Sequence, residues 1–89
     1  MFTSIGVETA RRYEQSEIQG MLDALENEEK YGFVLRAKGV FQDASGAWFQ
    51  FDYVPGESEI RPGSADYTGR LCVIGSRIQE AALRELFKV

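Results

Sequence analysis

Apolar and polar residues alternate along several segments of the chain, and this pattern predicts most of its secondary structure. The alternation is clearest in residues 32–42 and 47–54, where aromatic and aliphatic side chains recur at every second position. The turn-forming residues 43–46 (Asp-Ala-Ser-Gly) separate the two runs, and Gly46 can adopt a positive φ. The sequence therefore predicts a β-hairpin.

Three further segments favour strands. Residues 2–9 alternate in the same way, residues 58–61 form a short run, and residues 70–75 are partly apolar on both faces. Apolar residues on both faces are typical of an interior strand, so we expect residues 70–75 to lie inside the sheet. Residues 62–69 are rich in turn-forming residues and are expected to form a loop.

Apolar residues at helical spacing predict two helices. The first is expected to begin at Ser16 and to end near Asn27, and the second is expected to begin at Ser76. A glutamine stands three residues after each serine, which is the spacing of a capping box that would satisfy free backbone N–H groups. The apolar stripes consist of Ile18, Met21, Leu22 and Leu25 in the first helix, and of Ile78, Ala82, Leu83, Leu86 and Phe87 in the second.

The predicted order is therefore strand, helix, three or four strands, helix (β-α-β-β-(β)-β-α). Strands grouped between helices are typical of an α+β fold, here an antiparallel sheet of four to five strands with two helices packed on one face. No linker or internal repeat divides the chain, so residues 1–89 are expected to form a single domain. The core face of the sheet is expected to carry Phe33, Leu35, Ala37, Phe41, Phe49, Phe51 and Tyr53.

The amino-acid composition excludes several kinds of catalytic and metal site. A chain of 89 residues with no histidine has no imidazole base, no Ser-His-Asp triad and no imidazole-ligated zinc. One cysteine allows no intrachain disulfide and suits a reducing, cytoplasmic location. The net charge of −4 disfavours nucleic acid, whose binding depends on neutralising phosphates. No signal peptide and no apolar run of membrane-spanning length is visible.

The sheet face opposite the core is the candidate functional surface. Arg36 and Lys38 point to it, and Trp48 and Arg70 are expected beside them, so these four residues are candidates for docking a partner. The alternative is an ordinary solvated sheet face with cross-strand ion pairs, such as Lys38 with Asp52. The residues alone leave both interpretations open.

Other motifs in the sequence give weaker evidence of a functional site. The glycines at 63 and 69 have the spacing of a phosphate loop, but Arg70-Leu71 replaces the required Lys and Ser/Thr. Cys72 lies in an apolar strand and is expected to be a buried, inert thiol. The acidic residues Glu57, Glu59 and Asp66 are expected to form a solvated group rather than a cation site. We therefore predict no catalytic residue and no metal ligand.

Two segments resemble the C-terminal domain of CobW-type GTPases. The segment Arg36-Ala-Lys-Gly39, after the apolar residues 33–35, is similar to the "LRxKG" strand of that domain. Residues 70–75 and the helix after them resemble its last strand and final helix. The first strand, Arg11-Arg12-Tyr13 and the first helix precede them in the family's order, although Tyr13-Glu14 departs from the common "RPF"-like pattern. The resemblance covers nearly the whole chain.

The resemblance implies a function. CobW-like proteins are cytoplasmic metallochaperones or metal-insertion factors, linked among other roles to cobalamin synthesis, and their P-loop GTPase domain precedes this smaller domain. The GTPase domain carries the phosphate loop and a Cys-x-Cys-Cys motif, and this chain contains neither. The chain would then be a non-catalytic accessory domain, and GTP and a divalent metal, Zn or Co, would bind elsewhere. It could be part of a longer protein or stand alone.

The resemblance also assigns partners and residues. A CobW-type GTPase domain or a client metalloprotein would dock on this domain, with Arg36 and Lys38 either contacting the partner or forming ion pairs within the domain. Gly39 and Gly75 would be structural positions of the motif, with Gly39 allowing a bulge or a close backbone approach. Free strand edges also allow a homodimer. A small-molecule-sensing regulatory domain of ferredoxin-like type is the alternative from another functional class.

Overall fold

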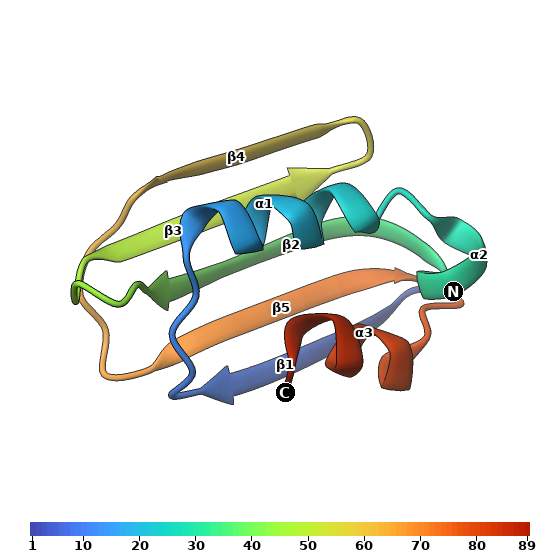
Figure 1. The fold of residues 1–89 in the computed structure, drawn as a ribbon. Coiled ribbons are helices and arrows are strands. Elements are labelled where there is room, and N and C mark those ends of the chain that lie inside the picture. Colours follow the sequence, from blue (N-terminus) through green and yellow to red (C-terminus); the bar gives the residue numbers. More distant parts are fainter.

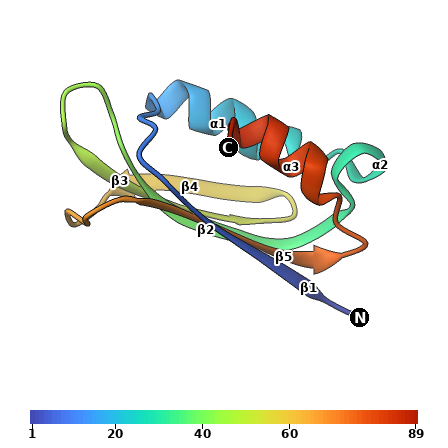
Figure 2. The same cartoon turned by 90° about the horizontal axis from the view of Figure 1, so that it is seen from below.

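The computed structural model describes the whole chain, residues 1–89, as five strands and three helices. All neighbouring strands pair antiparallel, in the order β1-β5-β2-β3-β4 (Figure 1). Helices α1 and α3 lie side by side on one face of the sheet, and the opposite face is uncovered (Figure 2). In chain order the elements are β1 Thr3–Thr9, α1 Gln15–Ala24, α2 Glu28–Tyr31, β2 Phe33–Gln42, β3 Trp48–Val54, β4 Glu57–Pro62, β5 Gly69–Ser76 and α3 Glu80–Phe87.

This architecture confirms the α+β prediction, including the antiparallel sheet and the two main helices on one face. The strand at residues 70–75 lies inside the sheet, between β1 and β2. Four consecutive strands and a terminal helix differ from the β-α-β-β-α-β order of a ferredoxin-like fold, so that alternative fold type is wrong. None of the helices has the length and apolar character needed to cross a membrane.

The hairpin between β2 and β3 forms as the sequence predicts. The backbone N–H of Asp43 donates to the carbonyl of Ala47 at 2.9 Å, and Gly46 adopts φ 91°. The Asp43 carboxylate accepts hydrogen bonds from the hydroxyl and backbone N–H of Ser45 and from the backbone N–H of Ala47. These bonds, that from the Ser45 hydroxyl above all, hold the pKa of Asp43 below its usual value. The turn thereby fixes the pairing of the two aromatic-rich strands.

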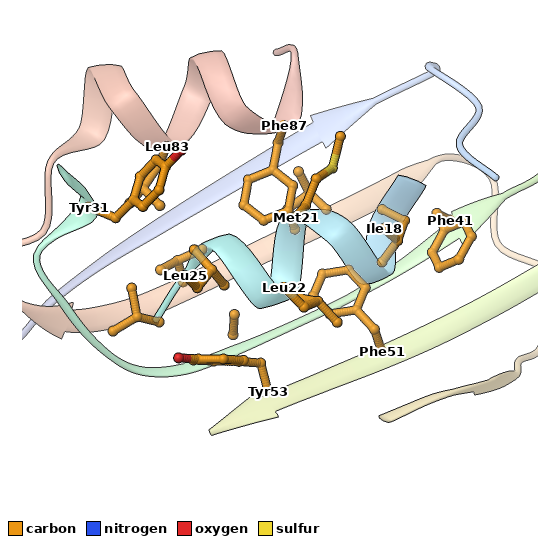
Figure 3. Packing of buried hydrophobic residues seen from close by; sticks show 14 of the residues in the cluster. Ile18, Met21, Leu22, Leu25, Tyr31, Phe41, Phe51, Tyr53, Leu83 and Phe87 are labelled. Atoms are coloured by element: carbon orange, nitrogen blue, oxygen red, sulfur yellow. The ribbon is translucent and has the colours of Figure 1, made fainter. Parts of the chain in front are cut away.

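The core lies between the sheet and the two main helices. The α1 residues Ile18 and Leu22 lie near Phe41 and Phe51 of the sheet, and Met21 points toward Phe87 of α3 (Figure 3). The ring of Phe41 stacks on that of Phe49 with centroids 5.5 Å apart. The hydroxyl of buried Tyr13 donates to the backbone carbonyl of Phe87, which ties the entry to α1 to the end of α3.

The start of β2 departs from the predicted alternation. The pairing with β5 shifts register between Val34 and Arg36, so one extra residue, Leu35, is accommodated as a β-bulge. Val34 is consequently buried at 2% exposure, whereas Phe33 and Leu35 are 36% and 38% exposed. The prediction that Phe33 and Leu35 belong to the core is therefore wrong, because the bulge reverses the faces before Arg36.

The helix boundaries also differ from the prediction. Helix α1 begins at Gln15 and α3 at Glu80, and neither start has a side-chain cap, so both predicted capping boxes are wrong. Ser16 lies inside α1, and Ser76 is the last residue of β5. A short helix, α2, follows α1; the Asn27 side chain accepts from the backbone N–H of Lys30 at its start, at 3.2 Å. The residues directly after Asn27, where the first helix was expected to end, therefore form another helix.

Candidate functional site

The uncovered sheet face, which we call the open face, is the candidate site. It carries the side chains that alternate with the core residues along each strand, such as Lys38 between buried Ala37 and half-buried Gly39 on β2. No helix covers it (Figure 2). The residues on this face therefore contribute little to the core and are available to a partner.

The centre of the open face is a hollow of about 690 Å³ that draws residues from all five strands. Across one row of paired residues, Gly6, Cys72, Lys38 and Asp52 lie side by side on β1, β5, β2 and β3. Gly6 has no side chain, and no atom lies within 4 Å of where its Cβ would stand. Open space therefore remains at Gly6 and next to the small thiol of Cys72. The charged residues of the hollow are Arg36, Lys38, Arg61 and Arg70, with Glu8, Asp52 and Asp66.

Asp52 organises one side of the hollow. One carboxylate oxygen accepts from Arg36 at 3.1 Å and the other from Arg61 at 2.8 Å. The hydrogen bond from Arg61, followed by that from Arg36, lowers the pKa of Asp52 and outweighs its partial burial. Arg61 also lies 3.5 Å from a carboxylate oxygen of Glu59. The Asp52 carboxylate is thus held ionised between two guanidinium groups.

This network corrects the expected pair of Lys38 with Asp52. The two residues are directly opposite each other on β2 and β3, but Asp52 bonds to arginines that lie diagonally across the strands. A long arginine side chain reaches a diagonal neighbour, and its planar fork suits a carboxylate better than an ammonium does. Lys38 is left without an ion-pair partner.

Arg70 forms the other side of the hollow together with the loop before β5. Its guanidinium lies 3.6 Å from a carboxylate oxygen of Asp66 and 4.9 Å from the centroid of the Tyr67 ring. The Tyr67 hydroxyl donates to the carboxylate of Glu8 at 3.1 Å. The predicted loop at residues 62–69 therefore holds Arg70 over the hollow by an ion pair and a cation–π contact.

Exposed apolar residues gather at one end of the open face. Phe33 and Leu35 at the start of β2 and Val54 at the end of the antiparallel neighbour β3 lie at the same end of the sheet, and all three are 36–41% exposed. We call these three residues the apolar end. The bulge that removes Phe33 and Leu35 from the core is what creates it, so the sequence pattern gave no sign of it.

The structure brings together three of the four predicted docking residues. Arg36, Lys38 and Arg70 all line the hollow. Trp48 lies away from it, at the hairpin end, where it pairs with Gln42 and is half-buried. Sequence reasoning missed Arg61 and Gly6, although a glycine inside a strand is a known sign of a close approach or an open space.

Gly39 and Gly75 lie beneath the candidate site and contact the core. A Cβ at Gly39 would collide with the backbone carbonyl of Arg70 and stand 2.7 Å from Cε2 of Phe51. A Cβ at Gly75 would collide with the carbonyl of Phe33 and stand 2.8 Å from Cγ2 of Ile78. Both positions thus need glycine because neighbouring strands and core side chains approach closely there.

The residues present fit neither GTP nor a catalytic metal. The segment between the glycines at 63 and 69 joins two strands, whereas a phosphate loop leads from a strand into a helix. No three metal-ligating side chains come together anywhere in the chain. The carboxylates of Glu59 and Asp66 instead form ion pairs with arginine side chains. Cys72, expected to be buried, is half-buried and lines the hollow.

The chain matches one known family along nearly its whole length. The family described as the cobalamin synthesis protein cobW C-terminal domain matches residues 2–89. The fold is similar to that of a Zn(II)-bound YjiA GTPase from E. coli, with 24% identity and a TM-score of 0.76 over 98% of this chain. A Zn(II)-bound triple mutant of the YjiA GTPase gives 23% identity, the same TM-score of 0.76 and the same 98% coverage. No curated protein matches the sequence.

The similarity concerns one part of these larger proteins. This chain spans 29% of each YjiA chain, and at such identity the likeness shows the shared fold alone. The family match does more, because it covers the segments at residues 36–39 and 70–75 that carried the resemblance in sequence, in one continuous stretch. The chain therefore belongs to the CobW C-terminal domain family.

Proposed function

We propose that residues 1–89 act as one accessory domain that docks on a CobW-type P-loop GTPase domain through the open face and catalyses nothing itself. The observation that carries this proposal is a sheet face that no element of the chain covers, in a member of a family with a GTPase relative about three times as long. Any cover for that face has to come from a partner, and the GTPase domain is the partner that the family match supports best.

The open face combines two features of a binding surface. The apolar end exposes Phe33, Leu35 and Val54, which offer apolar area that a partner can bury. The hollow beside it carries four cations against three carboxylates, in a chain whose net charge is −4. Apolar contacts favour affinity, and charged groups around them favour one orientation and one partner.

The metal chemistry belongs to the partner in this proposal. GTP and a divalent metal, Zn or Co, bind to the GTPase domain, and the assembled protein works as a cytoplasmic metallochaperone. This chain contributes a docking surface without nucleic acid or membrane contacts. On its own it is expected to bind and hydrolyse no GTP, because it lacks a phosphate loop. Measured GTP turnover by the pure chain would contradict this.

Calorimetric titration of a separately produced CobW-type GTPase domain with this chain tests the proposal. Leu35→Ser removes apolar contact area from the apolar end and should weaken binding by about tenfold, while the free energy of unfolding changes by less than about 1 kcal/mol. Ala81→Ser is the matched control, because Ala81 is exposed on α3, on the covered side of the sheet. It should leave the dissociation constant unchanged.

Other outcomes would contradict docking of the GTPase domain on the open face. If the wild-type chain does not bind the GTPase domain, or if Leu35→Ser and Ala81→Ser bind equally well, docking through the open face is wrong. Binding of a client metalloprotein instead, or a concentration-dependent homodimer in sedimentation, would assign the open face to a different occupant and reject the GTPase domain.

A further inference from the structure

Lys38 is the one cation of the hollow without a counter-charge. Arg36 and Arg61 share the carboxylate of Asp52, and Arg70 pairs with Asp66. No acidic oxygen lies within ion-pair distance of the Lys38 ammonium, although Asp52 is its direct neighbour on β3. The arginines occupy the chain's own carboxylates and leave this ammonium free to pair with a group from outside.

The surroundings of Lys38 leave room for such a group. Lys38 belongs to the middle strand, and Cys72 and then Gly6 follow it in the direction of β1. The missing side chain at Gly6 and the small thiol at Cys72 leave open space on this side. A side chain that enters this space reaches the Lys38 ammonium. Arg70, Asp66 and Glu8 line the same part of the hollow.

The charge balance of the hollow selects a carboxylate. Each arginine of the hollow has a carboxylate partner and Lys38 has none, so one additional negative charge pairs the last free cation. A phosphate group carries nearly two charges at neutral pH and would stand close to Glu8, Asp52 and Asp66, which repel it. The arginines that would bind it bidentately already hold carboxylates. A single aspartate or glutamate side chain fits both the space and the charge.

We propose that the hollow binds an acidic side chain of the docking partner, and that Lys38 forms the ion pair with it. This inference rests on the proposed function, in which the GTPase domain covers the open face. Once the partner covers the hollow, water is excluded and the ion pair becomes selective, because any other residue would leave the Lys38 ammonium buried without a counter-charge. The rest of the chain is acidic and repels the same carboxylate elsewhere.

The first experiment titrates the GTPase domain with charge variants of this chain. Lys38→Gln is expected to weaken binding by about tenfold and Lys38→Glu by about a hundredfold, as expected for loss of a charge-assisted hydrogen bond followed by repulsion. Lys30→Glu is the control, because Lys30 is exposed on α2 and does not line the hollow. It introduces the same charge change and should bind within about twofold of the wild type.

The second experiment uses a probe that needs no GTPase domain. A blocked Glu-Glu dipeptide is expected to shift the amide NMR signals of Gly6, Lys38 and Cys72 in the wild-type chain but not in Lys38→Gln. A Gln-Gln dipeptide and inorganic phosphate should shift them far less. If the dipeptide shifts these signals while the GTPase domain does not bind, the proposed function fails and the assigned specificity stands.

The inference itself is overturned by either of two results. One is a GTPase domain that binds the wild type, Lys38→Glu and Lys30→Glu equally well, since docking then does not use this ammonium. The other is a hollow that responds equally to the Glu-Glu and Gln-Gln dipeptides, or more strongly to phosphate, since the site then does not select a carboxylate side chain.

Discussion

The two faces of the sheet are built from the same strands, but helices cover one and leave the other uncovered (Figure 2). On the covered face, Ala37, Phe41, Phe51 and Tyr53 are at most 3% exposed and pack against the helices. Burial of a large apolar side chain such as Phe41 or Phe51 contributes about 1.5–3 kcal/mol to folding. This face therefore accounts for much of the stability of the chain.

On the open face, the residues between these core positions are charged or partly exposed. Arg36 and Lys38 alternate with Ala37, and their side chains point to water or to ion-pair partners. Exposed ion pairs contribute about 1 kcal/mol or less, so replacing them costs the fold little. Substitutions on the covered face should therefore change stability, and substitutions on the open face should change binding.

Phe41→Ala is expected to give the largest effect on stability. Phe41 is fully buried and contacts the rings of Tyr13, Phe49 and Phe51. Truncation leaves a cavity and should lower the free energy of unfolding by about 3–5 kcal/mol, measured by urea denaturation. Because that loss can exceed the stability of a small domain, Phe41→Leu provides a milder variant with an expected loss of about 1–2 kcal/mol.

The neighbouring residue is the matched control. Val40 lines the hollow on the open face and is half-buried. Val40→Ala should cost about 1 kcal/mol or less, because little packing is lost there. Equal destabilisation by Phe41→Ala and Val40→Ala would show that the open face contributes to the fold as much as the covered face does.

Gly39→Ala should give the next largest effect, and Gly6→Ala provides the contrast. A Cβ at Gly39 meets the Arg70 carbonyl and the Phe51 ring, so the strands or the ring must shift, at an expected cost of about 1–3 kcal/mol. A Cβ at Gly6 meets nothing within 4 Å, and alanine is favoured over glycine inside a strand. Thermal and urea unfolding should show Gly6→Ala to be neutral or more stable by about 0.5 kcal/mol. Two equally destabilised variants would contradict the geometry.

Much of the fold was predictable because it depends on local patterns. The alternation of apolar and polar residues predicted the strands, and the turn-forming residues 43–46 predicted the hairpin. The apolar stripe of Ile18, Met21 and Leu22 predicted the first main helix. The bulge at Leu35 was not predictable, because strict alternation has no place for an extra residue and the shift is set by pairing with β5. Helix α2 was missed although Asn27 is a good capping residue, because its acidic residues suggest a solvated segment.

The candidate site was predictable only in part, for a similar reason. Alternation along one strand placed Arg36 and Lys38 on the open face. Which residues meet them depends on the register between strands, which a single sequence does not contain. Lys38 and Asp52 are direct cross-strand neighbours, which suggested an ion pair between them. The register instead brings Arg61 within hydrogen-bond distance of Asp52 and leaves Lys38 without a partner.

Asp52→Asn should have the smallest effect and tests whether the open-face ion pairs matter to folding at all. Hydrogen bonds from Arg61 and then Arg36 lower the pKa of Asp52 in the folded state. A lowered pKa means that the carboxylate adds stability at pH values above that of an unfolded aspartate, about 4, and that this stability is lost as the pH falls through the folded-state pKa. At pH 7 the substitution should cost at most about 1 kcal/mol, since both arginines are exposed by more than a third.

Urea denaturation of the wild type and Asp52→Asn at several pH values between 7 and 2 measures this difference. The gap between the two proteins should be widest near neutral pH and should close as the carboxylate protonates, because the wild type then also lacks the charge. Glu57→Gln removes another carboxylate of the same strand pair without breaking an ion pair, and it should stay within about 0.5 kcal/mol of the wild type at pH 7. A loss of several kcal/mol in Asp52→Asn would mean that the arginine network stabilises the fold, and the division between a face for folding and a face for docking would no longer hold.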